Sequence, residues 1–174
     1  MMRIFLIGFR GSGKSTLGKG AAKILDLPFV DLDEIFREKF GDISEFVAKN
    51  GWENFRQKES EILQETKKFR GICATGGGII ELAKNREFLK TEQTIFIDIP
   101  INELISRLTK KEGSRPRLEA DKDLETEIRE NFARRLPFYR EVAQLTFQPD
   151  LDKTKVENSA KLAEMIEIFD QRGK

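Results

Sequence analysis

The stretch Gly8–Ser15 reads GFRGSGKS and matches the phosphate-binding pattern G-x-x-x-x-G-K-[ST]. The residues before it, Arg3–Gly8, form a short apolar run without a polar face, which is typical of a strand buried on both faces of a parallel sheet. Apolar residues at helical spacing follow over Lys14–Leu25. A strand, a glycine-rich turn and a helix in this order are the context that a phosphate-binding loop requires.

Each residue type in this loop has a physical purpose. Glycines allow backbone angles and close approaches that a Cβ atom would block, so successive N–H groups can form an anion nest at the positive end of a helix. Lys14 is expected to place its ammonium against the β- and γ-phosphates, and Ser15 to offer its hydroxyl to Mg²⁺. The expected nucleotide-binding residues are Gly11, Ser12, Gly13, Lys14, Ser15 and Thr16.

Apolar runs and helical patterns alternate along the rest of the chain. Further strands are predicted at Phe29–Leu32, Gly71–Thr75, Thr94–Ile99 and Leu145–Gln148. Helices are predicted at Asp31–Phe40, Trp52–Lys68, Asn102–Thr109, Leu124–Leu136 and Val156–Arg172, and a turn at Asn50-Gly51. The alternation predicts an α/β fold with a mostly parallel sheet. A length of 174 residues predicts a single domain over residues 1–174.

Composition excludes several classes of function. The chain has 31 Lys and Arg against 30 Asp and Glu, a net charge of +1, so no nucleic-acid partner is expected. Histidine is absent, which excludes Ser-His-Asp hydrolases, and the single cysteine, Cys73, excludes an internal disulfide. No apolar run reaches the roughly 18 residues of a membrane span, and the opening MMRIFLIGF does not fit a signal peptide. We expect a cytoplasmic protein with no membrane partner.

Three further segments carry charged groups or glycines. Asp31-Leu32-Asp33 ends the second predicted strand, at the ligand-binding edge of a parallel sheet. Arg56 lies on a predicted helix, where Glu59 can hold its guanidinium from three residues away. Gly76-Gly77-Gly78 follows the third strand. Taken one at a time, these segments also fit a surface Asp pair, a surface ion pair and a tight turn.

A phosphate-binding loop does not by itself name the reaction. Switch-type GTPases need an N-K-x-D segment after a late strand, which this sequence lacks, whereas small kinases fit the length. Such kinases need a cationic lid over the phosphates. The charged segment Lys110–Asp123, broken by Gly113 and Pro116, fits a mobile lid and equally a solvated loop.

Together, the segments GFRGSGKST, DLD, FR, GGG, SRPRL and RLPFYR, in this order and spacing, resemble the shikimate kinase family from Arg3 to about Gln148. The resemblance implies a P-loop NTPase fold similar to nucleoside monophosphate kinases, with three αβα layers around a five-stranded parallel sheet ordered 2-3-1-4-5. It implies transfer of the γ-phosphoryl of ATP to shikimate, giving ADP and 3-phosphoshikimate in aromatic amino-acid biosynthesis. It also implies a substrate-binding segment at about residues 31–60 and a lid at about residues 110–123.

The same resemblance assigns four residues to the acceptor substrate. Asp33 would hold the acceptor diol, Gly77 would offer its amide, and Arg56 and Arg135 would grip the substrate carboxylate. From the residues alone, Arg135 also fits a helix-dipole partner, because Pro137 should end the predicted helix just after it.

On the nucleotide side, the resemblance places the metal-side aspartate at Asp31, acting through water beside Ser15, and the lid arginine at Arg115. The lid departs from the family pattern at Arg117, where leucine is more common; this arginine either adds a second cation or faces solvent. The residues implied in catalysis are Lys14, Asp33 and Arg115. The adenine side is marked only weakly, by Arg107 and by Pro149 in the loop after Phe147.

Two other functions remain open at this point. Another small kinase, such as a gluconate kinase or a nucleotide kinase, would use the same loop with a different acceptor. A non-catalytic nucleotide-binding protein would keep the scaffold, although retention of Lys14, Ser15, Asp33 and both arginines argues against it. The expected partners are ATP, Mg²⁺ and a small acidic hydroxylated substrate, and we expect a monomer.

Overall fold

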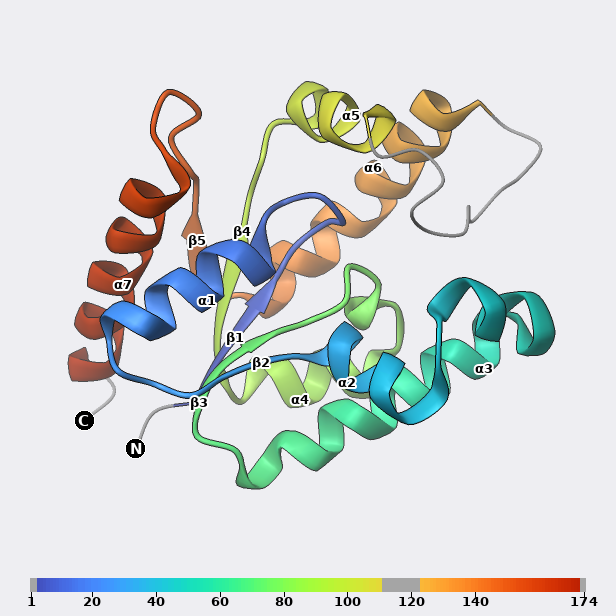
Figure 1. The fold of residues 1–174 in the computed structure, drawn as a ribbon, viewed down its shortest axis with the longest axis horizontal. Coiled ribbons are helices and arrows are strands. Elements are labelled where there is room, and N and C mark those ends of the chain that lie inside the picture. The colour runs from blue at the N-terminus through green and yellow to red at the C-terminus, as the bar shows by residue number, and fades with distance from the viewer. Residues whose placement is uncertain (1–2, 111–122, 173–174) are drawn as a thin grey trace.

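A computed structural model describes residues 3–110 and 123–172 of the chain (Figure 1). In the described residues, one parallel sheet has the strand order β2-β3-β1-β4-β5, which confirms the expected order. Its strands are β1 (Arg3–Ile7), β2 (Phe29–Asp31), β3 (Gly71–Ala74), β4 (Gln93–Ile97) and β5 (Leu145–Phe147). β1 is central, because Leu6 pairs with Ala74 of β3 on one side and with Ile95 of β4 on the other.

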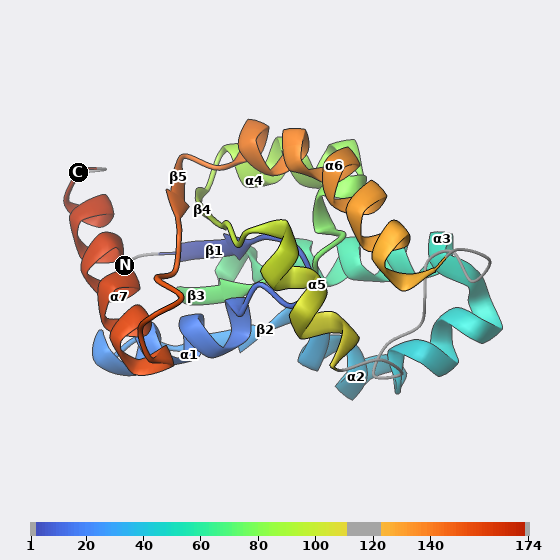
Figure 2. The same cartoon turned by 90° about the horizontal axis from the view of Figure 1, so that it is seen from above.

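Helices cover both faces of this sheet, as the three-layer prediction requires. α1 (Lys14–Ile24) and α7 (Lys155–Arg172) lie on one face, and α4 (Ala83–Lys90) and α6 (Leu124–Val142) lie on the other (Figure 2). None of the helices in the described ranges is long and apolar enough to cross a lipid bilayer.

The apolar run of β1 serves both faces, because successive side chains of a strand point in opposite directions. Ile4 and Leu6 belong to the core that packs under α1 and α7. Phe5 and Ile7 belong to the core on the other side, together with Tyr139 of α6. A strand buried on two faces needs apolar residues at every position, which is the pattern that the sequence shows.

Helices α2 (Leu32–Phe40) and α5 (Ile101–Thr109), the start of α3 (Ile43–Glu65) and the 3₁₀ turn η2 (Ile79–Glu81) lie toward the end of the sheet where the phosphate-binding loop leaves β1 (Figure 1). The rest of α3 runs back to the opposite end, where the 3₁₀ turn η1 (Thr66–Lys68) lies beside the start of β1 and its Thr66 carbonyl accepts from Arg3. The turn predicted at Asn50-Gly51 is confirmed as a break inside α3, where Gly51 has φ 81° and ψ 164°. The part of α3 before this break and the whole of α4 were not predicted from the sequence.

One predicted boundary is wrong. The sequence predicts that Pro137 ends the helix at Leu136, but α6 continues to Val142 with Pro137 inside it. Proline removes one N–H, the donor that would pair with the carbonyl of Ala133, and a helix usually pays in stability for that loss. Here the second part of α6 buries Tyr139 and Val142 almost completely, and this burial offsets the missing hydrogen bond.

Candidate active site

The phosphate-binding loop has the backbone that its glycines were expected to provide. Gly11 has φ 79° and Gly13 has φ 93°, in the left-handed region that side-chain-bearing residues rarely adopt. Gly13 is also the N-terminal capping residue of α1. The free amides at the start of α1 therefore face the loop, where they attract anions.

Lys14 is buried, with 7% of its surface exposed, and its ammonium folds back over the loop. Nζ donates hydrogen bonds to the carbonyl oxygens of Gly8 at 2.7 Å and Phe9 at 3.0 Å. The positive charge of Lys14 is thus held against the backbone of the phosphate-binding loop.

The two residues predicted on the metal side are in contact. The Ser15 hydroxyl donates to Oδ2 of Asp31. The other oxygen of Asp31, Oδ1, accepts from the backbone N–H of Asp33 at 2.9 Å and of Glu34 at 3.4 Å, so Asp31 caps α2. Within the described ranges, no cluster of three or more Asp, Glu, His or Cys side chains is arranged to hold a metal ion. A Mg²⁺ ion here would take the remaining oxygens from phosphate and water.

The first of two pockets beside the loop has a volume of about 360 Å³. It is lined by Gly11, Ser12, Gly13 and Thr16 of the loop and helix α1, by Arg107 and Lys110 from the end of α5, and, from the segment after β5, by Pro149, Asp150, Leu151, Lys153, Lys155 and Asn158. Arg107 donates from Nη1 to the Gly11 carbonyl at 3.1 Å, which ties α5 to the loop. Four of the expected nucleotide residues, Gly11, Ser12, Gly13 and Thr16, thus line one cavity with the two weakly marked adenine-side residues, Arg107 and Pro149, whereas Lys14 and Ser15 are not part of its lining.

The second pocket is smaller, about 40 Å³, and brings together the four residues predicted for the acceptor. Its lining includes Asp33, Arg56, Gly77 and Arg135. Arg10 lines it as well, a residue that sequence reasoning missed because the phosphate-binding pattern leaves its position unspecified. Arg10 and the neighbouring Gly11 line different pockets, so the loop is the wall between the two.

The expected pairing of Arg56 with Glu59 is confirmed. Nη1 of Arg56 lies 2.7 Å from Oε2 of Glu59, and the guanidinium carbon lies 5.4 Å from the ring centre of Trp52. Burial raises the pKa of Glu59, and the Asp33 carboxylate adds to this, while Arg56 acts in the opposite direction. Oε1 of Glu59 is buried without a hydrogen-bond partner in the described part of the chain.

The triple glycine makes room for these charged groups. A Cβ atom on Gly76 would overlap Oε1 of Glu59 and come within 2.9 Å of Oδ1 of Asp33, and one on Gly78 would overlap the Arg56 guanidinium. A Cβ atom on Gly77 would lie 2.9 Å from the backbone nitrogen of Arg10 in the phosphate-binding loop. The glycines therefore allow the segment after β3 to pack closely against the charged side chains of the second pocket and against the phosphate-binding loop.

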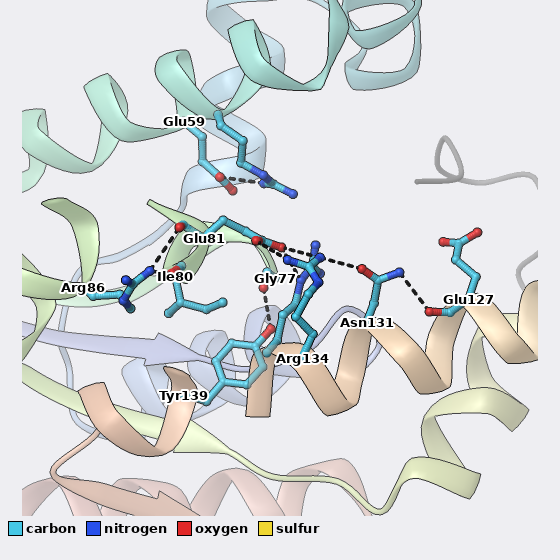
Figure 3. Close-up of polar contacts among 11 residues, drawn as sticks. Glu59, Gly77, Ile80, Glu81, Arg86, Glu127, Asn131, Arg134 and Tyr139 are labelled. Atoms are coloured by element: carbon cyan, nitrogen blue, oxygen red, sulfur yellow. Dashed lines mark hydrogen bonds and ion pairs between the residues drawn. The ribbon is translucent and has the colours of Figure 1, made fainter. Parts of the chain in front are cut away.

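Arg135 reaches the second pocket from α6 and is only 3% exposed. Its Nε donates to Oε1 of Glu81 at 2.7 Å, and its guanidinium carbon lies 5.5 Å from the ring centre of Phe9. Figure 3 shows the neighbouring contacts, in which Tyr139 donates its hydroxyl to the Gly77 carbonyl and Asn131 links Arg134 to the Glu127 carbonyl. Arg135 therefore lies in the same pocket as Arg56, and its predicted role in gripping the substrate carboxylate stays a prediction.

The lid arginine Arg115 and its neighbour Arg117 lie in residues 111–122, outside the described residues. The described residues on either side are Lys110, which lines the first pocket, and Asp123, which caps α6 through the N–H of Thr126 at 3.0 Å.

Comparison with known proteins agrees with this geometry. The family model "Shikimate kinase" matches residues 10–168. A shikimate kinase of Bacteroides thetaiotaomicron is 36% identical over 176 residues, which cover 97% of this chain and 100% of that protein. The bifunctional shikimate kinase/3-dehydroquinate synthase of Thermotoga maritima is 40% identical over 146 residues, 83% of this chain and 29% of that longer protein.

The fold is shared as well. The structure of a shikimate kinase from Acinetobacter baumannii in complex with shikimate superposes with a TM-score of 0.86 at 32% identity, covering 95% of this chain and 93% of that one. With the family model spanning most of the sequence and relatives matched over nearly their whole length, the chain belongs to the shikimate kinase family, a family of ATP-dependent kinases.

Proposed function

We propose that this chain transfers the γ-phosphoryl group of ATP to the 3-hydroxyl of shikimate. The observation that carries the proposal is a pocket of three arginines and two carboxylates separated from the nucleotide pocket by a single loop. Guanidinium groups are well suited to bind the carboxylate of an acidic substrate through paired N–H donors. Hydroxyl groups on the same substrate would meet the carboxylates.

The acceptor residues divide into holding and reacting groups. Arg56 and Arg135 approach the pocket from α3 and α6, so they can grip one carboxylate from two directions. Asp33 would accept a hydrogen bond from the attacking hydroxyl and take its proton as the new O–P bond forms and the bond to the leaving ADP oxygen breaks.

On the nucleotide side, the loop amides and Lys14 would hold the β- and γ-phosphates. Mg²⁺ would neutralise phosphate charge there. The Ser15 hydroxyl would ligate it directly, and Asp31, in contact with Ser15, would hold it through water. Arg115 would place a cation over the phosphates from a lid at about residues 110–123. We further propose a monomer with a single domain over residues 1–174 that acts in the cytoplasm.

A coupled assay of ADP release tests this function. Purified protein with ATP and Mg²⁺ is given shikimate, gluconate or a panel of nucleoside monophosphates, one at a time. We expect rapid ADP release with shikimate and near-background release with the others. Gluconate or a nucleotide as the preferred acceptor would contradict the proposal, and ATP binding without turnover of any acceptor would indicate a non-catalytic binding protein.

A further inference from the structure

We propose that Glu81 is a positioning residue of the acceptor pocket, which holds the Arg135 guanidinium by one edge so that its other edge faces the substrate carboxylate. The inference rests on the proposed function, because it takes Arg135 as a group that binds that carboxylate. Glu81 is 54 residues away from Arg135 in the sequence and no motif includes it.

Glu81 contacts two adjacent arginines of α6. Oε1 accepts from Nε of the buried Arg135 at 2.7 Å and from Nη2 of Arg134 at 3.1 Å, and Oε2 accepts from Nη1 of Arg134 at 2.6 Å (Figure 3). The side chain of Arg134 is 52% exposed and that of Arg135 is 3% exposed. One carboxylate therefore joins a surface arginine to a pocket arginine.

Glu81 binds Arg135 through Nε, which leaves the edge of the guanidinium formed by Nη1 and Nη2 available for the substrate. In the described part of the chain, the side-chain hydrogen bonding of Arg135 uses Nε alone. A guanidinium can take a carboxylate on the edge formed by Nη1 and Nη2 while Nε is engaged elsewhere. Fixing Nε removes rotational freedom from a long side chain, so less entropy is lost when the substrate binds.

The backbone that carries Glu81 is itself held in place. Arg86 donates from Nη1 to the carbonyl oxygens of Ile80 at 2.7 Å and Glu81 at 3.0 Å, and the Asn85 amide donates to the Ile79 carbonyl at 2.9 Å. These contacts fix the η2 turn that directly follows the triple glycine. A carboxylate on a fixed turn can determine the orientation of the guanidinium that it binds. A carboxylate on a mobile loop would instead move with that guanidinium.

Charge also favours this role over a simple surface ion pair. Arg10, Arg56 and Arg135 line the same small pocket, so each guanidinium repels the other two. Burial raises the pKa of Glu81, but hydrogen bonds and attraction from Arg134 and Arg135 outweigh burial and hold the pKa below its usual value. Glu81 is thus ionised at neutral pH and restrains Arg135 against that repulsion.

The decisive measurement is steady-state kinetics of Glu81→Gln with shikimate and ATP varied separately. Gln keeps the size of the side chain and removes its charge. We expect the KM for shikimate to rise about 10-fold, the lower range for a lost charge-assisted hydrogen bond, with the KM for ATP and kcat changed by less than about twofold. Glu125→Gln is the matched control, since Glu125 forms a surface ion pair with Arg129 on α6, the helix that carries Arg135, and it should change neither KM.

Two further variants keep the test independent of folding. Glu81→Asp keeps the charge but shortens the reach by one methylene, so we expect a smaller rise in the KM for shikimate. In an Arg135→Ala background, adding Glu81→Gln should raise the KM no further, because Glu81 acts through Arg135.

Three results would overturn the inference. A lower KM for shikimate in Glu81→Gln would mean that Glu81 competes with the substrate for Arg135. An unchanged KM with a lower melting temperature would make Glu81 merely structural, and additive effects in the double variant would separate it from Arg135. In each case the wild-type enzyme would still phosphorylate shikimate, whereas failure of the wild type to do so would overturn the proposed function instead.

Discussion

The nucleotide pocket and the acceptor pocket share the phosphate-binding loop as a wall, but they present different chemical groups. The first, about 360 Å³, is lined on the loop side by Gly11, Ser12 and Gly13, whose backbone amides suit phosphate oxygens. The second, about 40 Å³, is lined by charged side chains held in ion pairs, such as Arg56 with Glu59. Backbone groups are placed by the fold itself, whereas long charged side chains need partners to hold them.

This difference predicts which kinetic constant a substitution in each pocket should change. A change in the nucleotide pocket should act on the transferred phosphoryl group and therefore on kcat. A change among the supports of the acceptor pocket should act on substrate holding and therefore on KM. The following variants test that division.

Lys14→Met should have the largest effect. It removes the one ammonium held at the loop by the Gly8 and Phe9 carbonyls, and we expect kcat to fall by about 10³-fold or more. Shikimate should still bind, which fluorescence of Trp52 can follow because this residue lines the acceptor pocket. Loss of shikimate binding in this variant would show that the two pockets are not separable.

Asp33 lines the acceptor pocket, but we propose that it reacts with the substrate instead of only holding it, so Asp33→Asn should lower kcat by about 10²-fold, the range for removal of a general base. The change keeps size and a hydrogen-bonding oxygen but removes the charge, so shikimate should remain bound. Rapid-quench measurement of phosphoryl transfer separates the chemical step from binding. A near-normal kcat with a raised KM would make Asp33 a binding residue and would contradict its assignment as a base.

Gly78→Ala should disturb only substrate holding. Its Cβ would overlap the end of the Arg56 side chain, which can move aside, so the protein should fold with a melting temperature close to wild type. The displaced guanidinium should raise the KM for shikimate by about 10-fold, equivalent to about 1.4 kcal/mol. The KM for ATP is the internal control, and a rise in it would mean that the substitution also moves the loop.

The smallest effect concerns the dependence of stability on pH. The pKa of Glu59 is raised above 4.5, so its contribution to stability is full below pH 4.5 and is lost as pH rises through the folded-state pKa. The pKa of Glu81 is lowered below 4.5, so its contribution is present above pH 4.5 and is lost as pH falls through the folded-state pKa.

Melting temperatures of wild type, Glu59→Gln and Glu81→Gln across this range should therefore diverge in opposite directions. With rising pH, the advantage of wild type over Glu59→Gln should shrink, and its advantage over Glu81→Gln should grow. Each shift should be on the order of 2–4 °C for every kcal/mol involved. Parallel curves for the two variants would contradict the environments assigned to these carboxylates.

The sequence predicted the sheet and the phosphate-binding loop well because local rules determine both. Apolar runs identified all the described strands, and the glycines of the loop identified its positive φ angles. The end of α6 was predicted wrongly, because burial of Tyr139 and Val142 in the tertiary structure overrides the local effect of Pro137. The helix at Ala83–Lys90 was missed for a similar reason. Its apolar pattern is too short to predict a helix, and the helix is recognised only from its packing on the sheet.

The acceptor pocket was predictable only in part. Asp33, Arg56, Gly77 and Arg135 come from distant segments, and their meeting in one pocket followed from family resemblance rather than from any local pattern. Arg10 and Glu81 carried no such signal. Both make contacts across more than fifty residues, which only the folded chain shows: Arg10 donates from Nη2 to Oε1 of Glu127 at 2.9 Å, and Glu81 accepts from Nε of Arg135.

The packing of α7 against α1 has a consequence for synthesis on the ribosome. Gly20 of α1 approaches Ser159 of α7 so closely that a Cβ atom would overlap its hydroxyl, and Leu17 and Ala21 share a core with Leu162. The helix that follows the phosphate-binding loop ends at Ile24, whereas the helix that covers it begins only at Lys155 and is therefore translated much later. At about 5–20 residues per second, the nascent chain exposes this apolar face for on the order of ten seconds. Molecular chaperones thus have a defined surface and a defined interval in which to protect the chain.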